Sequence, residues 1–295
     1  MSDQTKSSEI KKTTNGVTEN PWHLLREFTA ARISLGRSGV SIPTEEMLAF
    51  QLAHAQARDA VHTPLDFEGL QQQLDELTLQ YPKLIRIKSL SVHSQASDRM
   101  VYLQRPDLGR SLDQQSAKKL HKIASQYTYS LAIVVADGLS ATAIYQNALP
   151  FIRLLLETLE HDEQSWTLAP ITLVEQGRVA ISDEIGQLLN ADLVLMLIGE
   201  RPGLSSPDSM GLYLTWAPQV GLNDSSRNCV SNVRPEGLIY SAAVQKAMYL
   251  LRESRRLKLS GVNLKDRSMA IGKDTVTGDT IEHEKHTPPI HFLSE

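Results

Sequence analysis

Short runs of apolar residues alternate with helical patterns through the second half of the chain. Residues 131–136, 171–174 and 193–198 are apolar runs, and each is followed by a polar turn. Unbroken apolar runs are typical of strands that are buried on both faces, and helices between them favour parallel pairing. A further run at 212–216 and a helical pattern at 239–257 follow. The pattern predicts an α/β fold with a Rossmann-like, open and mainly parallel sheet.

Helices are expected between these strands. Apolar positions at helical spacing predict them over residues 114–126, 141–159 and 182–189. Pro150 lies inside the second of these helices and is expected to kink or split it, because proline has no backbone N–H to donate.

The first 80 residues show mainly helical spacing. One helix is predicted over residues 21–35, a second after Pro43, and a third over residues 67–81. Two short strand candidates follow, at residues 84–90 and 100–103. The predicted sheet is therefore preceded by a mostly helical N-terminal region.

Composition shifts divide the chain into four parts. Residues 1–20 are rich in Ser, Thr, Lys and Asn and are expected to form a flexible tail. Residues 21–99 form the mostly helical region, and residues 100–262 form the Rossmann-like domain. Residues 263–295 are polar and are expected to form a tail or a peripheral arm.

Charge and cysteine content exclude several classes of protein. The formal net charge of −4 and the lack of a long basic cluster argue against a nucleic-acid-binding protein. A single cysteine excludes an internal disulfide framework and fits a reducing compartment. No apolar stretch approaches the roughly 18 residues that a membrane-spanning helix needs. We therefore expect a soluble, intracellular protein with no membrane partner.

Candidate chemistry lies in the loops after the apolar runs. Ligands of open parallel sheets bind beyond the carboxyl ends of the strands, which selects the loops that begin at Asp137, Gln176 and Gly199. The G-x-G-x-x-G, G-x-x-x-x-G-K-[ST] and G-x-S-x-G motifs are absent. A dinucleotide dehydrogenase and a P-loop enzyme are therefore disfavoured.

For two of these loops, both a structural role and contact with a ligand remain open. Glu200 follows an apolar strand, and its carboxylate needs partners, which Arg201 or the N–H groups of a ligand could supply. Arg178 and Val179 combine a cation with an apolar surface, which suits either packing at a strand end or contact with a ligand.

Structural roles are the simpler interpretation elsewhere. Asp137 and Ser140 suit the cap of the following helix. Cys229 has no partner thiol, and such a residue is more often a small buried hydrophobe than a nucleophile. His283, Glu284 and His286 match no metal-binding spacing, so no metal site is predicted.

Five motifs follow one another in a fixed order along the chain. They are Arg105-Pro106-Asp107-Leu108-Gly109-Arg110, Asp137-Gly138-Leu139-Ser140, Gly177-Arg178-Val179, Gly199-Glu200-Arg201-Pro202-Gly203-Leu204 and Arg227-Asn228-Cys229-Val230-Ser231-Asn232. Together they resemble a known family, the small (light) subunit of ethanolamine ammonia-lyase. The resemblance covers about residues 20–265, and its specificity comes from the combination of the motifs.

The resemblance implies a division of labour between two subunits. Enzymes of this family convert ethanolamine to acetaldehyde and ammonia with a radical that adenosylcobalamin supplies. The large subunit binds ethanolamine and holds most catalytic residues, so no catalytic residue is expected in this chain. The small subunit closes the cobalamin site, and the resemblance places its cofactor contacts at Val179, Glu200 and Cys229. No Asp-x-His-x-x-Gly motif occurs, so this chain is expected to supply no ligand to cobalt.

The sequence also bears on the location of the protein in the cell and on two alternative functions. The resemblance suggests the cytoplasm or a bacterial microcompartment, although residues 1–20 have few apolar residues for the amphipathic helix that targets some relatives. Two alternatives stay open from the residues alone. One is a stand-alone module that binds a nucleotide or another phosphate through Arg178 or Arg201, and the other is a non-catalytic scaffold.

Overall fold

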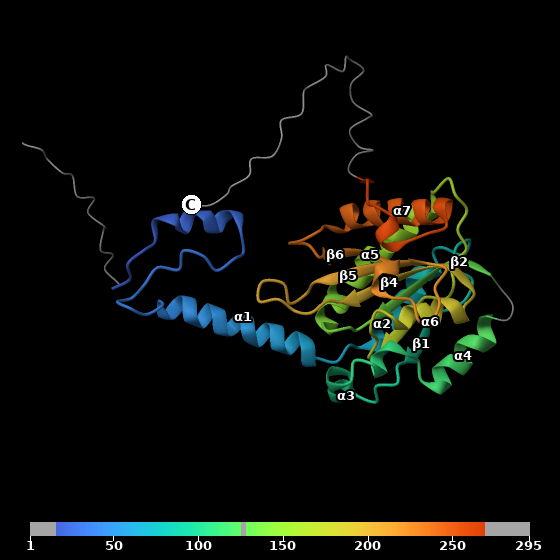
Figure 1. The fold of residues 1–295 in the computed structure, drawn as a ribbon, viewed down its shortest axis with the longest axis horizontal. Coiled ribbons are helices and arrows are strands. Elements are labelled where there is room, and N and C mark those ends of the chain that lie inside the picture. Colours follow the sequence, from blue (N-terminus) through green and yellow to red (C-terminus); the bar gives the residue numbers. More distant parts are fainter. Residues whose placement is uncertain (1–15, 125–127, 269–295) are drawn as a thin grey trace, which may run out of the picture.

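A six-stranded mixed sheet forms the centre of the computed structural model, which describes residues 16–124 and 128–268 (Figure 1). The strands lie in the order β1-β3-β2-β4-β5-β6. Their bounds are Leu90–His93 (β1), Tyr129–Ala136 (β2), Thr172–Glu175 (β3), Ala191–Gly199 (β4), Met210–Trp216 (β5) and Arg227–Val233 (β6). The α/β prediction is confirmed, and the sheet takes its first strand from before the predicted boundary at residue 100.

Connection length explains why the sheet is mixed. β1, β3, β2 and β4 are parallel, and helices of the chain lie in the connections from β2 to β3 and from β3 to β4. β5 follows β4 after only ten residues, 200–209, and pairs with it in the antiparallel sense. β6 is also antiparallel to β5. Parallel neighbours need a long crossover, which these last two connections do not contain. The predicted parallel pairing therefore holds for four strands and fails for the last two.

Helices cover the two faces of the sheet to different extents. Leucines of α2 and apolar residues of α5 and α7 pack on one face, which we call the closed face. Apolar residues of α4 and α6 pack on the other, and Figure 1 shows α7 on one side of the sheet and α4 with α6 on the opposite side. The helices are α1 (Thr44–His62), α2 (Phe67–Thr78), α3 (Arg99–Gln104), α4 (Gln114–Ala124), α5 (Ala141–Glu160), α6 (Ile181–Leu188) and α7 (Tyr240–Leu257).

The second face is covered only in part. Its apolar cluster includes residues of β1, β3, β2 and β4, together with Ile181 and Ile185 of α6. From β5 only Tyr213 packs against this cluster, and β6 adds no residue to it. We call this side the half-open face, because the part over β5 and β6 carries no apolar cover among the described residues.

Helix α5 shows how local sequence sets these elements. Ser140 Oγ accepts a hydrogen bond from the Ala143 N–H at 3.1 Å and so caps the helix. The cap that the sequence suggested is therefore present. Pro150 lies inside the helix, which nevertheless runs from Ala141 to Glu160 without a break. The buried apolar side chains before and after Pro150 hold both halves against the sheet, so the helix is not split.

Two predicted strands differ from the structure. Residues 100–103 form part of helix α3 instead of a strand, because Asp98 caps the N–H groups of Met100 and Val101. Within residues 84–90, only Leu90 enters a strand. Leu84 and Ile85 are buried in the closed-face core without joining the sheet.

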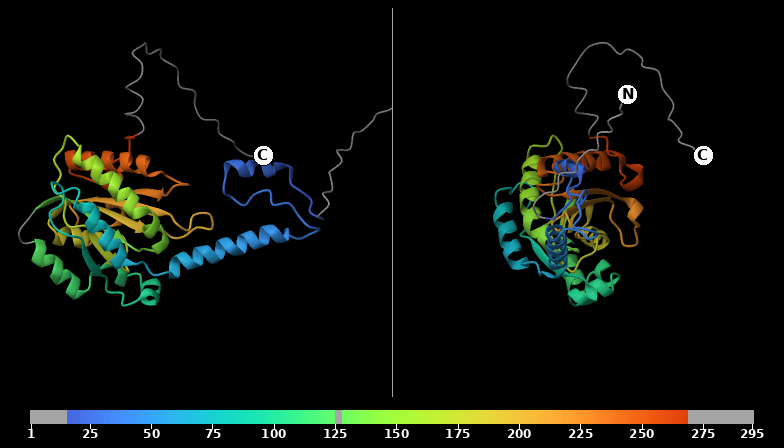
Figure 2. Two further views of the ribbon diagram at one scale, coloured as in Figure 1. Left: turned by 180° about the vertical axis from the view of Figure 1, so that it is seen from behind. Right: turned by 90° about the vertical axis from the view of Figure 1, so that its left-hand side faces the viewer.

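The N-terminal part of the described chain is an arm. The predicted helix at 21–35 is a 3-10 helix, η1, over Pro21–Phe28 with no buried residue. Helix α1 runs away from the sheet and carries the arm at its far end, as Figures 1 and 2 show. Only Ala53 and Ala60 are buried in α1. Little packing supports these two helices, which explains why the first is shorter than its pattern predicts.

Three short 3-10 helices complete the described chain, namely η2 (Leu108–Arg110), η3 (Asp224–Ser226) and η4 (Gly261–Asn263). Within residues 16–124 and 128–268, no helix combines the length and the apolar character that crossing a bilayer requires. The predicted tails lie largely in residues 1–15 and 269–295, outside the described residues.

Candidate functional site

The predicted site residues belong to three segments that meet at the half-open face. Val179 follows β3 and lies just before α6, and Glu200 follows β4 directly. Cys229 lies on β6, level with Tyr213 of β5 and, across β5, with Met196 of β4. Because β3 and β4 are parallel members of one sheet, Val179 and Glu200 lie at the same edge of that sheet.

The carboxylate of Glu200 is held by the protein through one oxygen. Glu200 Oε2 accepts a short hydrogen bond from Ser209 Oγ and a second, at 3.2 Å, from the Asn232 N–H. Glu200 Oε1 lies against Gly211, where a Cβ would approach it to 2.9 Å. The residue is partly exposed, so one oxygen is fixed and the other can accept a hydrogen bond from a ligand.

Arg201 is not the partner of Glu200. The Arg201 side chain is exposed, and within the described part of the chain no ion pair joins it to Glu200. Asn232 instead adopts a left-handed backbone with φ of 61°, and the β5–β6 register shifts near Gly211. This irregularity turns the Asn232 N–H toward Glu200, and bulges commonly re-aim groups in this way.

Cys229 is exposed, whereas the simpler interpretation of the sequence was a buried thiol. Its side chain is exposed, and Cys229 Sγ lies 3.3 Å from Ser231 Oγ. Tyr213 is its cross-strand neighbour, and burial, with a further contribution from Cys229, raises the pKa of the Tyr213 hydroxyl. We call the surface formed by Gly211, Tyr213 and Cys229 the β5–β6 shelf. Its three residues carry no charged side chain, and it lies beside the Glu200 carboxylate.

A buried ion pair fixes α6 beside this shelf. Arg227 of β6 forms an ion pair with Asp183 of α6, and both side chains are almost completely buried. Burial raises the pKa of Asp183, and the hydrogen bond and charge of Arg227 act in the opposite direction. Arg227 also contacts Asp224 at 2.8 Å.

The ion pair also relates the positions of Val179 and Cys229. Cys229 lies two residues beyond Arg227 along β6, a rise of about 7 Å toward the carboxyl end of the sheet. Val179 lies four residues before Asp183, in the turn that leads from the carboxyl end of β3 into α6. Three elements therefore place Val179, Glu200 and Cys229 on the half-open face, toward the carboxyl end of the sheet.

Arg178 and Asp137 take structural roles next to this site. Arg178 Nη2 donates to the Tyr102 carbonyl at 3.2 Å, and its guanidinium stacks on the Tyr102 ring at 4.1 Å. Asp137 does not cap α5. It accepts hydrogen bonds from the Gly138 and Gly177 N–H groups instead, at 2.9 and 3.2 Å. Burial raises the pKa of Asp137 to about 6, and the Arg99 guanidinium 3.5 Å away acts against that rise.

Sequence reasoning missed the residues that support the three predicted ones. Ser209, Asn232 and Tyr213 were not singled out, although Asn232 closes a motif that was. Arg227 is the first residue of the same motif, so the sequence did draw attention to this buried arginine. Its partner Asp183 is 44 residues away, and only the fold brings the two together.

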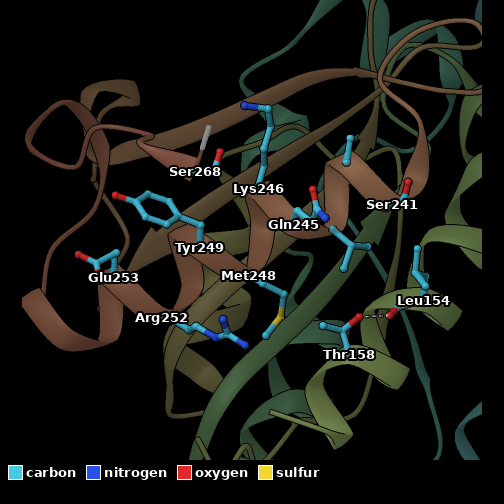
Figure 3. Close-up of a pocket in the computed structure, with 12 residues that line it drawn as sticks. Leu154, Thr158, Ser241, Gln245, Lys246, Met248, Tyr249, Arg252, Glu253 and Ser268 are labelled. Atoms are coloured by element: carbon cyan, nitrogen blue, oxygen red, sulfur yellow. Dashed lines mark hydrogen bonds between the residues drawn. The ribbon is translucent and has the colours of Figure 1, made fainter. Parts of the chain in front are cut away.

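A separate hollow lies elsewhere in the described part of the molecule. It is an open groove of about 700 Å³ on the α5 and α7 helices of the closed face, shown in Figure 3. Tyr249, Arg252 and Glu253 of α7 line it together with Leu154 and Thr158 of α5. None of the predicted site residues lines this groove, so it does not belong to the candidate site.

Metal ligands do not cluster in the described chain. Across residues 16–124 and 128–268, no group of three or more His, Cys, Asp or Glu side chains could hold a metal ion. The cluster of His283, Glu284 and His286 lies outside the described residues.

Comparison with known proteins points to one family. The family model of the ethanolamine ammonia-lyase light chain matches residues 19–265. A protein of Pseudomonas fluorescens (strain Pf0-1) named ethanolamine ammonia-lyase small subunit is 57% identical over 252 residues, which is 85% of this chain and 88% of that protein. A protein of the same name from Pseudomonas paraeruginosa (strain DSM 24068 / PA7) is 56% identical over 258 residues, 85% of this chain and 89% of that protein.

Proposed function

Because the chain belongs to the ethanolamine ammonia-lyase light chain family and is thus one subunit of a lyase, we propose that it completes an adenosylcobalamin site on a large subunit. The proposed reaction converts ethanolamine to acetaldehyde and ammonia. When bound, the cofactor supplies the radical for this reaction. The large subunit binds ethanolamine, and this chain holds one side of the cofactor.

The state of the Glu200 carboxylate carries this proposal. One oxygen accepts hydrogen bonds from Ser209 and Asn232, and the other lies beside Gly211 of the β5–β6 shelf on a partly exposed residue. Cobalamin carries amide groups around the edge of its ring, and each amide offers N–H donors. A pre-oriented carboxylate binds such a donor with little loss of side-chain entropy. Glu200 therefore suits a residue that holds the cofactor, not one that transfers a proton to the substrate.

Val179 and Cys229 supply the other contacts in this proposal. Val179 is half-buried and packs against the half-open face, which leaves part of its side chain for an apolar contact. Cys229 is exposed on the shelf, where a thiol offers a polarizable surface to a large ring. The Rossmann-like character of the sheet is part of the same proposal, because such sheets bind ligands at this edge.

Two further elements of the proposal concern location and the cobalt ion. The enzyme is proposed to act in the cytoplasm, with a bacterial microcompartment as the alternative. The chain is proposed to contribute no ligand to cobalt, so its residues act only on the periphery of the cofactor.

Cofactor titration of the two-subunit enzyme tests the proposal. Glu200→Ala should weaken adenosylcobalamin binding about 10-fold or more, since a hydrogen bond to a charged group contributes about 1.5–3 kcal/mol. Glu76→Ala is the matched control, because Glu76 is an exposed carboxylate on α2. The chain without the large subunit should not deaminate ethanolamine. Unchanged cofactor affinity in Glu200→Ala would remove Glu200 from the site.

A stand-alone phosphate-binding module has no structural observation in its favour. The Arg178 guanidinium is engaged by Tyr102, and the Arg201 side chain is exposed. Isothermal titration of the isolated chain with nucleotides should show no tight binding. Tight binding would reverse the order of the two proposals.

A further inference from the structure

The Tyr102 ring lies between two guanidinium groups. The Arg99 guanidinium carbon is 4.9 Å from the centroid of the ring, and that of Arg178 is 4.1 Å from it. Tyr102 is completely buried on α3. Two cations on one buried ring repel each other, so the arrangement needs compensating contacts.

Those contacts converge on one turn, Gly177-Arg178-Val179. The Tyr102 hydroxyl donates to the Gly177 carbonyl at 3.0 Å. The Arg178 N–H donates to the Gly109 carbonyl at 2.7 Å, and its side chain donates to the carbonyl of Tyr102. Burial raises the pKa of the Tyr102 hydroxyl, which keeps it protonated and able to donate. The turn is therefore tied to α3 and η2 through three separate groups.

Arg99 connects the same turn to two other segments. Its Nε donates to the Val61 carbonyl in the last turn of α1 at 2.6 Å. Its Nη1 donates to the Gly138 carbonyl at 2.7 Å and contacts Asp137 at 3.5 Å. Asp137 in turn accepts from the Gly177 N–H. One side chain thus links the base of the arm, the turn after β2 and the turn after β3.

The turn has little freedom to move within this network. A Cβ on Gly177 would meet Ala136 Cβ at 2.9 Å, and a Cβ on Gly109 would meet Arg178 Cγ at 2.8 Å. Contacts this close leave no room for a side chain, so the backbones of the two turns pack directly on their neighbours.

We propose that Tyr102 and Arg99 are positioning residues that fix the Gly177-Arg178-Val179 turn and so set Val179 against the cofactor. This proposal rests on the proposed function, since it assigns the residues that orient one of its three contacts. Neither residue needs to touch the cofactor, because both act through the backbone of the turn. The effect of losing them should therefore depend on whether Val179 itself is present.

The test uses the enzyme assembled from this chain and the large subunit. Tyr102→Phe keeps the ring between the two guanidiniums and removes only the hydrogen bond to Gly177. Adenosylcobalamin Kd should rise about 3- to 10-fold, the range that one hydrogen bond represents. At saturating cofactor, kcat should stay within about twofold of the parent value, because the variant changes cofactor binding and not the reaction.

Tyr240→Phe is the matched control. The Tyr240 hydroxyl donates to Asn147 Oδ1 at 2.8 Å on the closed face, so this variant also loses one hydrogen bond between α7 and α5. It should lower the midpoint of thermal unfolding in the same way as Tyr102→Phe but leave the cofactor Kd unchanged. Equal rises of Kd in both variants would mean a general loss of stability and would overturn the proposal.

A double-mutant cycle with Val179→Ala separates positioning from a general effect. If Tyr102 acts through Val179, Tyr102→Phe should change Kd less than twofold in the Val179→Ala background, since coupled residues are not additive. Full additivity would overturn the positioning role. A normal Kd in Tyr102→Phe beside a raised Kd in Glu200→Ala would reject this inference alone, whereas normal values in both would reject the proposed function.

Discussion

The two faces of the sheet use the same strands for different purposes. On the closed face, α2, α5 and α7 bury side chains from β2, β3, β4, β5 and β6 in one large cluster. On the half-open face, the smaller cluster ends at β4, with Tyr213 of β5 at its margin. The closed face therefore supplies most of the buried apolar core, and the half-open face leaves a surface for binding. Substitutions on each face should therefore have different consequences.

Polar groups follow the same division. The half-open face carries the buried Arg227–Asp183 ion pair and the hydrogen bonds of Glu200. The closed face carries the Asn147 side chain, which bridges α5, residue 208 and Tyr240. An ion pair in a buried position is weak evidence for stability, because desolvation offsets the attraction between the charges. On the half-open face, the Arg227–Asp183 pair instead orients α6 relative to β6.

Phe151→Ala on the closed face should give the largest change in stability. The ring is completely buried in α5, and truncation should cost about 3–5 kcal/mol of unfolding free energy through lost burial and a new cavity. Urea unfolding of the purified chain measures this. A change below about 1 kcal/mol would show that the closed face is not the main source of stability.

Arg227→Met should come next, because it leaves Asp183 buried without its partner. Breaking a buried pair in this way should cost about 3–4 kcal/mol. Arg256→Met is the matched control, since the Arg256–Glu253 pair is largely exposed, and it should change the unfolding free energy by less than about 1 kcal/mol. Similar losses in both variants would contradict the role given to the buried pair.

Asp137→Asn should remove a pH dependence of stability. The folded-state pKa of Asp137, about 6, lies above its ordinary value of 3.8, so the folded chain holds this proton more tightly than the unfolded chain. The associated stability is complete below about pH 4 and is lost as the pH rises through 6, by up to about 3 kcal/mol. Urea unfolding of parent and variant between pH 4 and 8 measures the difference. Parallel curves would mean that Asp137 has an ordinary pKa.

Cys229→Ser should have the smallest effect, below about 0.5 kcal/mol, because the thiol is exposed. The wild-type thiol gives a more direct test of the half-open face. Iodoacetamide should label Cys229 in the isolated chain, and addition of the large subunit with adenosylcobalamin should protect it. Peptide mass spectrometry distinguishes this thiol from those of the partner. Equal labelling in both states would mean that the shelf stays open in the complex.

The two faces also differ in how far sequence predicts them. Apolar runs such as 193–198 identified the strands buried on both faces, and helical spacing identified the helices that cover them. The antiparallel direction of β5 depended on the lack of a helix in residues 200–209, a signal that the apolar pattern does not carry. In β6 only Arg227, Val230 and Val233 are buried, so the strand has no continuous apolar run that would predict it.

The residues of the candidate site could be predicted from the sequence, but the residues that hold them in place could not. The family resemblance named Val179, Glu200 and Cys229, and the strand-end rule independently selected the loops of the first two. Their supporting groups come from distant positions, such as Tyr102 for the 177–179 turn. Such long-range pairs follow from tertiary packing, which single-sequence patterns do not encode. The strand prediction at 100–103 failed for a local reason instead, because Asp98 caps a helix at these residues.

The irregular end of β6 has a consequence for the subunit before assembly. β6 is an edge strand, and a regular edge would offer unpaired N–H and C=O groups to another molecule. Here the register shift near Gly211 and the left-handed Asn232 distort it. Leu238 bridges to Val233, and Asn228 bonds to the Gly261 carbonyl, so other segments lie beside both ends of the strand. A distorted, flanked edge is a poor template for strand addition, so this side of the sheet disfavours intermolecular sheets between copies of the chain.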